Sequence, residues 1–595
     1  MLKKFVKKYF YYFTYFYRYL RYRLLAAFAL SMLVAFFDGL GLTLFLPLLQ
    51  MLDGGESSGE GLGYLAFVIT GLEGMGISIT IVSVLLVMVV FFCLKGLVKF
   101  WEGAYRTSLR RYYVKRLRYL TVNNLGRYSY KSFVLSDSGR IQNTVSGEME
   151  RVVNGFVNYL NFLQAAAMVG VYVVLALSVN AQFTALVVLG GVLTNFIYTS
   201  IYGKTKHQSK LLTGNNHAFQ GLLIQKVAFF KYLLATGSMD RFGDRLKSLI
   251  TKIENSHRKI GLLNSFINAI REPMIIVIVV GVILIEIQVL GGNLGAIILS
   301  LMFFYRALSY LMSGQSFWNA LMNYHGSMDN LTEFLRDLEK GREQQGNSQF
   351  QCFTEKMEFQ QVSFGYWDKP ILKEISLELP KNTTLALVGE SGSGKTSLMN
   401  LMAGLALPDS GRLLIDGVDM AELDRRSFQR RIGYITQEPV IFNDTVFNNV
   451  TFWDVDSAAN RERCKQAMQK AAVWNFVETL PQKEDSPLGT NGIMVSGGQK
   501  QRISIARELY KEVDFLLMDE ATSALDSETE QIIQENIDAL RGQYTIVIIA
   551  HRLSTVRNVD QILVLKEGEI VQKGNFAELI SSSSVFQRMV EMQEF

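Results

Sequence analysis

Residues 389–396 read Gly-Glu-Ser-Gly-Ser-Gly-Lys-Thr, which has the GxxxxGK[ST] spacing of a phosphate-binding loop. The apolar stretch 384–388 precedes the loop and predicts a strand. The glycines let consecutive backbone N–H groups point at phosphate oxygens, and the N-terminus of the following helix adds partial positive charge. Lys395 can reach the β- and γ-phosphates, and the Thr396 hydroxyl can hold Mg²⁺. We therefore expect a nucleoside triphosphate to be bound by Gly389, Glu390, Ser391, Gly392, Ser393, Gly394, Lys395, Thr396 and Ser397.

Two carboxylates stand at the end of a second apolar run. Residues 513–518 predict a strand, and Asp519 and Glu520 follow directly. Asp519 is placed to provide a second Mg²⁺ contact, and Glu520 is placed to act as the general base that orients the attacking water. Two solvated acids at an ordinary strand end are the alternative, which the phosphate-binding loop argues against.

A further anion site is predicted between these motifs, at Ser496-Gly497-Gly498-Gln499. Serine and glycines at a helix start offer free N–H groups and the positive end of the helix dipole. With this motif in place, the chain resembles the ATP-binding cassette (ABC) family. The resemblance implies that these four residues of one cassette close on the γ-phosphate held by the phosphate-binding loop of another. Two ATP molecules are then sandwiched in a head-to-tail dimer.

The other parts of the family pattern match residue by residue. Tyr366 matches the aromatic side chain that stacks on adenine, and Gln437 matches the lid glutamine that senses Mg²⁺ and the transmembrane domain. Asp526 ends the D-loop 523–526, and His551 matches the switch histidine at the γ-phosphate. The resemblance thus implies ATP and Mg²⁺ as cofactors. It implies a metal site of Thr396, Gln437 and Asp519, with catalysis by Glu520, His551 and Gln437.

The resemblance covers residues 350–595 and shows two departures. Val495 replaces the usual leucine, which leaves the Ser-Gly-Gly site intact. Asn491 stands where relatives often carry a glutamate, which puts one contact between domains in doubt. Because Glu520 is present, both ATP sites of a homodimer are expected to hydrolyse ATP.

The first half of the chain predicts a membrane domain. The 595-residue sequence is 49% hydrophobic, with the apolar excess before residue 340. About 20 apolar residues are needed to cross a bilayer as a helix. Six segments meet this requirement: Leu24–Leu52, Ser78–Trp101, Val152–Ser178, Gln182–Gly203, Ile260–Leu290 and Gly292–Trp318.

Charge predicts the orientation of these spans. The positive-inside rule places the Lys- and Arg-rich connections 103–150 and 204–259 in the cytoplasm, and the segment 53–60 is acidic and outside. Both termini are then cytoplasmic in a multi-pass protein of the cell inner membrane. The two cytoplasmic connections resemble the helical extensions of ABC exporters, with tips expected at Lys131–Val145 and Asn215–Gln225. The resemblance implies an exporter-type (type IV) half-transporter that must dimerise.

The first 23 residues carry seven basic side chains and no acid, interleaved with aromatics. This composition predicts a helix in the headgroup layer of an anionic leaflet. A cleaved signal peptide needs an apolar core and a small-residue cleavage site, and neither is present. Nucleic-acid binding is disfavoured because the segment abuts a span and the net charge is only +6.

These observations predict an α-helical polytopic membrane domain fused to an α/β P-loop NTPase domain. The expected division is a basic aromatic helix at 1–23, a six-helix exporter domain at 24–338, a polar linker at 339–352 and the ABC domain at 353–595. Cys93, Cys352 and Cys464 are scattered without zinc spacing, so free thiols are expected.

Intramembrane charges are the candidates for substrate binding, because each is costly in lipid. Counted along their helices, Lys95, Arg271 and Arg306 fall at the level of the inner-leaflet headgroups. A basic ring there could capture an anionic head while the tail stays in the bilayer. In the alternative, Lys95 reaches toward the headgroups, and Arg271 and Arg306 form structural pairs with Glu272 or Asp38.

The substrate is the least determined property. Segments 39–47 and 61–76 look similar to parts of bacterial lipid-linked oligosaccharide flippases, which favours a lipid or lipid-linked oligosaccharide as amphiphilic substrate. An exporter of peptides or hydrophobic drugs is the first alternative, and a regulatory ATPase that transports nothing is the second. A homodimer is the simplest assembly, and a heterodimer with a related half-transporter is also open.

Overall fold

A computed structural model describes residues 10–45, 48, 74, 80–179, 181–288, 294–366, 369–519, 527–550, 553–583, 586–587 and 590. The chain divides into two compact units. The helical unit comprises Met1–Tyr128 and Ser136–Gly341, and the cassette unit comprises Ser129–Leu135 and Arg342–Phe595. Each unit is described by itself below.

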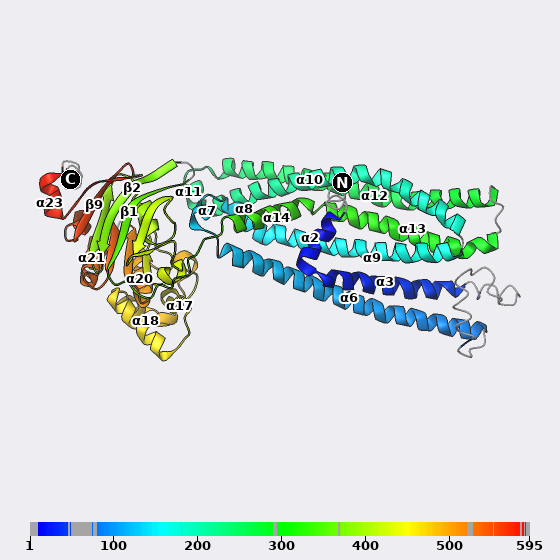
Figure 1. Ribbon diagram of the computed structural model, residues 1–595, viewed down its shortest axis with the longest axis horizontal. Helices are drawn as coiled ribbons and strands as arrows, with labels where there is room; N and C mark the ends of the chain where they lie inside the picture. The colour runs from blue at the N-terminus through cyan, green and yellow to red at the C-terminus, as the bar shows by residue number, and fades with distance from the viewer. Residues whose placement is uncertain are drawn as a thin grey trace. The chain divides into compact units, whose positions relative to one another are not determined.

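Long helices build the helical unit, and several of them lie side by side in Figure 1. The short helix α2 (Tyr11–Leu20) is separated from α3 by Arg21, whose φ of 50° breaks the helix. The remaining elements are α3 (Tyr22–Thr43), α6 (Ile81–Leu125), α8 (Ser138–Asn143), a π-helical turn (Thr144–Glu148), α9 (Met149–Val179), α10 (Ala181–Ala228), α11 (Phe230–Ala235), α12 (Met239–Gln288), α13 (Leu294–Met322) and α14 (His325–Lys340).

The six predicted spans fall on α3, α6, α9, α10, α12 and α13, which confirms the predicted fold class. Among the described residues, four helical stretches are long and apolar enough to cross a membrane: Tyr22–Thr43, Ile81–Leu125, Ser138–Ser178 and Met239–Ile285. The end of the first predicted span and the segments 53–60 and 61–73 lie outside the described residues.

The two connections that were predicted to be cytoplasmic differ in detail from the sequence prediction. The first predicted tip, Lys131–Val145, overlaps the short helix α7 (Tyr130–Val134) and contains α8. The second was expected at Asn215–Gln225, but α10 continues through this segment to Ala228. The turn follows at α11, which ends before Gly237. Gly237 has a φ of 62°, a left-handed conformation that glycine adopts without steric cost and that stops a helix.

The N-terminal helix α2 packs against protein along one face. Tyr12, Phe16 and Leu20 recur at a spacing of four residues and are buried. The Tyr12 hydroxyl lies 2.8 Å from Nδ1 of His325 at the start of α14, and Tyr11 donates a hydrogen bond to Asp329. Exposed Arg18 and Arg21 lie away from the buried face.

The cassette unit contains two sheets in the part of the chain that is described (Figure 1). An antiparallel sheet has the order β2-β1-β4-β5, and the second sheet has the order β10-β9-β3-β8-β7-β6. The strands are β1 (Lys356–Tyr366), β2 (Lys369–Pro380), β3 (Thr384–Gly389), β4 (Ser410–Ile415), β5 (Val418–Asp419), β6 (Ile432–Ile435), β7 (Phe515–Asp519), β8 (Thr545–Ile549), β9 (Gln561–Lys566) and β10 (Glu569–Gly574).

Helices complete the cassette on both sides of the larger sheet. They are α15 (Lys395–Met402), α16 (Arg425–Gln429), α17 (Val446–Thr451), α18 (Ala458–Lys470), α19 (Trp474–Thr479), α20 (Gly497–Tyr510), α21 (Ser527–Leu540), α22 (Leu553–Val556) and α23 (Phe576–Ser582). The central strands β3, β7 and β8 pair in parallel.

The alternation of side chains along these central strands creates two cores. Leu385 and Leu387 of β3 point to one face of the sheet and pack with the core that includes Phe428. Ala386 and Val388 point to the other face and pack with the core that includes Ile503 of α20. Because both faces are covered, these strands are apolar at nearly every position, as buried parallel strands are.

Candidate functional site

The phosphate-binding loop connects the carboxyl end of β3 to the N-terminus of α15. Gly394 caps α15 with a φ of 104°. Gly389 has a φ of 151°, and a Cβ at this position would lie 2.2 Å from the carbonyl oxygen of Leu565. The loop therefore keeps its course close to β9 only with glycine at position 389. In this arrangement the N-terminus of α15 points toward the ligand that the loop binds.

Lys395 is folded into this loop. It is 6% exposed, and its ammonium donates hydrogen bonds to the carbonyl oxygens of Gly389 at 2.7 Å and Glu390 at 2.9 Å. The Ser393 hydroxyl is buried and has no hydrogen-bond partner among the described residues. A cation, an orphaned hydroxyl and a helix N-terminus in one glycine-rich loop fit the phosphates of a nucleotide.

Strand pairing brings a carboxylate to the same edge of the sheet. β8 lies between β3 and β7, and Asp519 at the end of β7 pairs in register with Ile549 of β8. Since parallel strands end at a common edge, Asp519 and the phosphate-binding loop share that edge. Gln437 follows the neighbouring strand β6 and reaches the same side. The predicted Mg²⁺ set of Thr396, Gln437 and Asp519 thus comes from three segments at one edge.

Several predicted residues of this site lie outside the described residues. They are Glu520, the D-loop 523–526 with Asp526, and His551. Tyr366 is described and ends β1 in the antiparallel sheet, where it is half-buried. Burial raises the pKa of its phenol, and Asn400 of α15 partly offsets that effect.

The serine-glycine motif forms the start of α20. Ser496 is the N-cap: its hydroxyl accepts a hydrogen bond from the N–H of Gln499, and the Gln499 side chain accepts from the N–H of Ser496 at 2.8 Å. This reciprocal capping fixes the helix end. Ser496 and Gly497 are exposed, so the positive end of α20 is accessible.

One contact of the cassette was missed by the sequence reasoning. Lys131 of α7 pairs with Asp409 and lies 5.1 Å from the ring centre of Phe364. Asp409 also accepts a hydrogen bond from the N–H of Gly365, the residue before Tyr366. Nothing in the sequence pattern connects positions 131 and 409, so only the packing of α7 reveals this link.

In the helical unit, Lys95 of α6 forms an ion pair with Asp38 of α3. Tyr172 of α9 donates a hydrogen bond to the second oxygen of Asp38, and Tyr310 of α13 stacks on Tyr172 at 5.9 Å. Asp38 is 1% exposed. The partner of Lys95 is therefore the buried carboxylate of Asp38 on the neighbouring helix. From the sequence alone, Asp38 is a candidate partner of Arg271 or Arg306.

Arg306 and Arg271 differ from Lys95. Arg306 of α13 is exposed, and the part of the chain that is described gives it no ion pair. Its guanidinium is close enough to Tyr172 and Tyr310 to interact electrostatically with both. Arg271 lies on α12, but its side chain is outside the described residues.

A second polar layer joins the same three helices, α3, α6 and α9. Glu102 is 2% exposed and accepts hydrogen bonds from Ser31 and from Gln164. Arg106 completes the layer through hydrogen bonds to Gln164 and Asn161. Ser31 and Glu102 are each seven residues from Asp38 and Lys95 along their helices, which separates the layers by roughly 10 Å.

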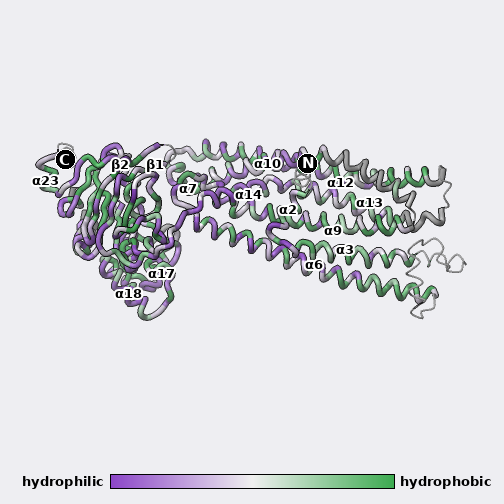
Figure 2. The backbone as a smooth tube through the Cα atoms, viewed as in Figure 1, coloured by the Kyte–Doolittle hydropathy of each residue, from purple (hydrophilic) through white to green (hydrophobic). Residues whose placement is uncertain are grey.

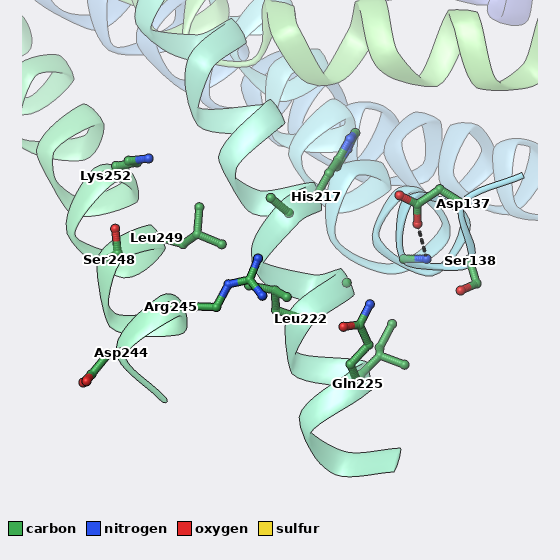
Figure 3. Close-up of a pocket in the computed structure, with 14 residues that line it drawn as sticks. Asp137, Ser138, His217, Leu222, Gln225, Asp244, Arg245, Ser248, Leu249 and Lys252 are labelled. Atoms are coloured by element: carbon green, nitrogen blue, oxygen red, sulfur yellow. Dashed lines mark hydrogen bonds between the residues drawn. The ribbon is translucent and has the colours of Figure 1, made fainter. Parts of the chain in front are cut away.

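A cavity of about 730 Å³ is lined by residues of α8, α10 and α12. Figure 3 draws these residues. Arg245 extends into it from α12 toward Leu222 of α10, and Asp137 caps α8 at its rim. At the opposite rim, Asp244 is bound by Lys247. The cavity combines charges of both signs, and its lining residues do not include those of the Asp38–Lys95–Tyr172 cluster.

The fold and the phosphate-binding loop together define a class: a polytopic helical domain joined to a P-loop ATPase in one chain. A model of the ABC transporter family matches residues 372–523. The chain is 27% identical over 565 residues to the heterocyst differentiation ATP-binding protein HepA of Nostoc sp., covering 95% of this chain and 92% of that protein.

Two further relatives and one solved structure extend the comparison. The chain is 40% identical over 256 residues to the ATP-dependent lipid A-core flippase of Pseudomonas aeruginosa and 38% identical over 261 residues to that of Vibrio cholerae. These matches cover 43% and 44% of this chain, and 42% and 44% of the flippases. A bacterial Atm1-family ABC exporter with ATP bound has the same fold, with a TM-score of 0.78 at 23% identity over 97% of this chain and 99% of that one.

The chain is therefore an exporter-type half-transporter of the ABC superfamily, with the membrane domain and the nucleotide-binding domain fused. It is a multi-pass membrane protein that couples ATP hydrolysis to transport. The predicted family and enzyme class are confirmed.

Proposed function

We propose that this exporter is a flippase that moves an amphiphilic substrate, a lipid or lipid-linked oligosaccharide, across the cell inner membrane by alternating access. The observation that carries the proposal is the cluster of Asp38, Lys95 and Tyr172 with Arg306 nearby. Ionisable side chains are costly inside a membrane and mark substrate paths. An amphiphile with an anionic head fits such a site, because the head can bind these cations while the apolar tail stays in the bilayer.

The depth of the cations supports capture of a head group. Lys95 is fourteen residues from Ile81 at the start of α6, and Arg306 is twelve residues from Leu294 at the start of α13. At 1.5 Å per residue both lie about 20 Å along their helices. We propose that Lys95, Arg306 and Arg271 bind the head, with Asp38 holding Lys95 until an anion competes for it.

The lipid A-core flippases support the choice of substrate, since an amphiphile is what their name states they move. In our proposal the Lys- and Arg-rich extensions and both termini are cytoplasmic, as the positive-inside rule predicts, and the head enters from that side.

The proposed ATP cycle uses the cassette residues in fixed roles. Tyr366 stacks on adenine, and residues 389–397 hold the phosphates. Thr396, Gln437 and Asp519 would hold Mg²⁺, which would neutralise phosphate charge. Glu520 orients water as the general base, while His551 contacts the γ-phosphate and Gln437 and Asp526 complete the closed site.

The proposed assembly is a homodimer, with a heterodimer as the alternative. Two exposed features support contact with the cassette of a second chain. One is the start of α20 at Ser496–Gln499, which would close on the partner's ATP. The other is the tip around α11, where Phe229, Phe230, Tyr232 and Leu234 are exposed. Such an apolar tip is typical of a surface that another protein covers.

Lipid mass spectrometry tests the substrate. The full-length protein is purified gently without nucleotide, beside Glu520→Gln trapped with ATP. A glycolipid or polyprenyl-linked glycan retained by the first sample and lost from the second is the expected result. Equal amounts of bulk phospholipid in both samples would contradict the proposal and favour export of peptides or hydrophobic drugs.

Transport of that amphiphile in proteoliposomes tests the cation site. Arg306→Gln is expected to slow translocation at least fivefold, while Arg258→Gln, an exposed arginine on α12, serves as the control. Equal translocation by both variants would remove Arg306 from the substrate site. Failure of every amphiphile to cross, with ATPase activity intact, would favour a regulatory ATPase.

A further inference from the structure

One stripe of α6 carries four exposed basic side chains. Arg110, Arg111, Lys115 and Arg118 recur at the three- and four-residue spacing of one helix face. With Thr107, Val114 and Tyr119 they line a shallow groove of about 480 Å³. The opposite face of α6 packs against protein through buried Leu109, Tyr113 and Leu117.

The four side chains of this basic stripe have no acidic partner in the described part of the chain. Lys115 lies 5.2 Å from the ring centre of Tyr119, a cation–π contact that leaves its charge uncompensated. Other cations of α6 are satisfied: Arg106 pairs with Glu102, and Arg116 donates a hydrogen bond to the carbonyl oxygen of Tyr19. The uncompensated charge is therefore concentrated on one face.

The stripe lies past the expected membrane boundary on α6. Figure 2 shows hydrophobic colour along the N-terminal half of α6 and hydrophilic stretches in its C-terminal half. Phe100 and Trp101 are 71% and 66% exposed at this transition, as interfacial aromatics are. At 1.5 Å per residue, Arg110 lies about 14 Å past Trp101 and Arg118 about 26 Å past it.

These depths indicate which partner can contact the whole stripe: a flat membrane surface or a ligand that projects from it. The headgroup layer on each side of a bilayer is only about 5–8 Å thick. A flat anionic leaflet can therefore reach Arg110 and Arg111 through their long side chains, but not Arg118. A ligand that contacts the whole stripe must carry negative charge over about 12 Å along the helix.

We infer that the basic stripe Arg110–Arg111–Lys115–Arg118 binds the extended, multiply anionic head group of the transported amphiphile before its tail enters the membrane domain. This inference rests on the proposed flippase function and cytoplasmic orientation. Arginine binds carboxylate and phosphate groups through paired N–H donors. Because a single exposed ion pair contributes little, several charges on one head are needed for tight binding.

Binding of defined glycolipids to the full-length protein in nanodiscs tests the inference. The probes are a trisialylated glycosphingolipid, phosphatidylglycerol and the free trisialylated oligosaccharide. The stripe variant carries Arg110→Gln, Arg111→Gln, Lys115→Gln and Arg118→Gln. The control variant removes the same charge from exposed positions of α12 through Arg241→Gln, Lys252→Gln, Arg258→Gln and Lys259→Gln.

We expect the stripe variant to bind the glycosphingolipid at least tenfold more weakly than wild type, while the control variant binds it within twofold. Binding of phosphatidylglycerol should fall far less in the stripe variant than binding of the glycosphingolipid, because a flat leaflet reaches only Arg110 and Arg111, and it should be unchanged in the control variant. The free oligosaccharide should bind wild type more weakly than the glycolipid, because the tail holds the head near the stripe, and should still lose affinity in the stripe variant.

Three outcomes would overturn the inference. Equal glycosphingolipid binding by wild type and stripe variant would show that the stripe holds no head group. An equal loss of phosphatidylglycerol and glycosphingolipid binding would identify it as a contact with the leaflet surface. Dissociation of the stripe variant's dimer in light scattering would identify it as an interface between copies. Failure of the proposed function is distinguishable: the glycolipid would bind through the stripe without crossing the membrane.

Discussion

The ammonium of Lys131 lies 2.8 Å from Oδ1 of Asp409, and the other oxygen of Asp409 accepts a hydrogen bond from the N–H of Gly365 at 2.8 Å. Lys131 belongs to α7, a few residues beyond the end of α6, and Gly365 precedes Tyr366, the predicted adenine-stacking residue. Within the cassette unit, a short polar path thus joins α7 to the strand that carries Tyr366.

Lys131→Ala should uncouple hydrolysis from transport more than it destabilises the protein. Both members of the pair are substantially exposed, at 34% and 51%, so the ion pair contributes at most about 1 kcal/mol. We expect a melting temperature within a few degrees of wild type and at least a threefold lower amount of substrate moved per ATP hydrolysed in proteoliposomes.

Lys356→Ala is the matched control for this prediction. Lys356 forms a comparable exposed pair with Glu378 at 2.8 Å, elsewhere on the cassette. It should leave the ratio of transport to hydrolysis unchanged. A wild-type ratio for Lys131→Ala would mean that the Lys131–Asp409 pair carries no coupling.

Arg507 should be essential for the stability of the cassette. It is 5% exposed, and its guanidinium donates hydrogen bonds to the carbonyl oxygens of Asn449 and Val440 and to the Asn449 side chain. It thereby ties α20, which is capped by Ser496, to the segment after Gln437. Arg507→Ala removes three hydrogen bonds of a buried side chain and takes this donor away from the carbonyl oxygens of Asn449 and Val440, at a cost of about 3 kcal/mol or more.

For a domain as large as the cassette, this loss of stability in Arg507→Ala lowers the melting temperature by roughly 6 °C or more. Thermal unfolding of the full-length protein measures the decrease. Arg461→Ala, at a 33% exposed side chain, is the control and should lower it by less. Similar melting temperatures for the two variants would refute this role of Arg507.

Gly139→Ala and Gly221→Ala should have opposite effects on the helical unit. A Cβ at Gly139 of α8 would lie 2.8 Å from the Cα of Gly221 on α10, so the two backbones would have to separate. Such overpacking costs about 1–3 kcal/mol. A Cβ at Gly221 meets no atom within 4 Å, and alanine favours the helix by up to about 1 kcal/mol.

Thermal unfolding of the two variants in detergent checks this pair. We expect a lower melting temperature for Gly139→Ala and an equal or higher one for Gly221→Ala. An equal decrease in both variants would show that the close approach of α8 and α10 is not what requires glycine at position 139.

Cys464 should resist alkylation at neutral pH. Burial of its side chain, reinforced by Glu484, raises the pKa of the thiol to about 12, although Arg461 acts in the opposite direction. Because the thiolate is the reactive form, only about one molecule in ten thousand is reactive at pH 8, and reactivity rises as the pH approaches 12.

Mass spectrometry after iodoacetamide treatment measures this difference. Cys352 is exposed and should be modified first, whereas Cys464 should react only after denaturation. Equal modification of both cysteines in the folded protein would mean that the site around Cys464 opens readily.

The nucleotide chemistry was predictable from the sequence because each part of it is local. The eight residues 389–396 carry their own glycines, lysine and threonine, and the strand before them is apolar from Leu385 to Val388. The six spans were predictable for a similar reason, since a hydrocarbon layer demands a long apolar run whatever its neighbours are. Both signals depend on neighbours in sequence.

Only the tertiary structure decided which charges meet. Asp38 and Lys95 are 57 positions apart, and Lys131 and Asp409 are 278 apart. The same limit explains the misplaced second tip: nothing in 215–225 distinguishes a turn from a continuing helix, and α10 runs on to Ala228. A side chain finds its partner through the packing of whole helices and strands, and that packing depends on the sum of many weak contacts rather than on any short pattern.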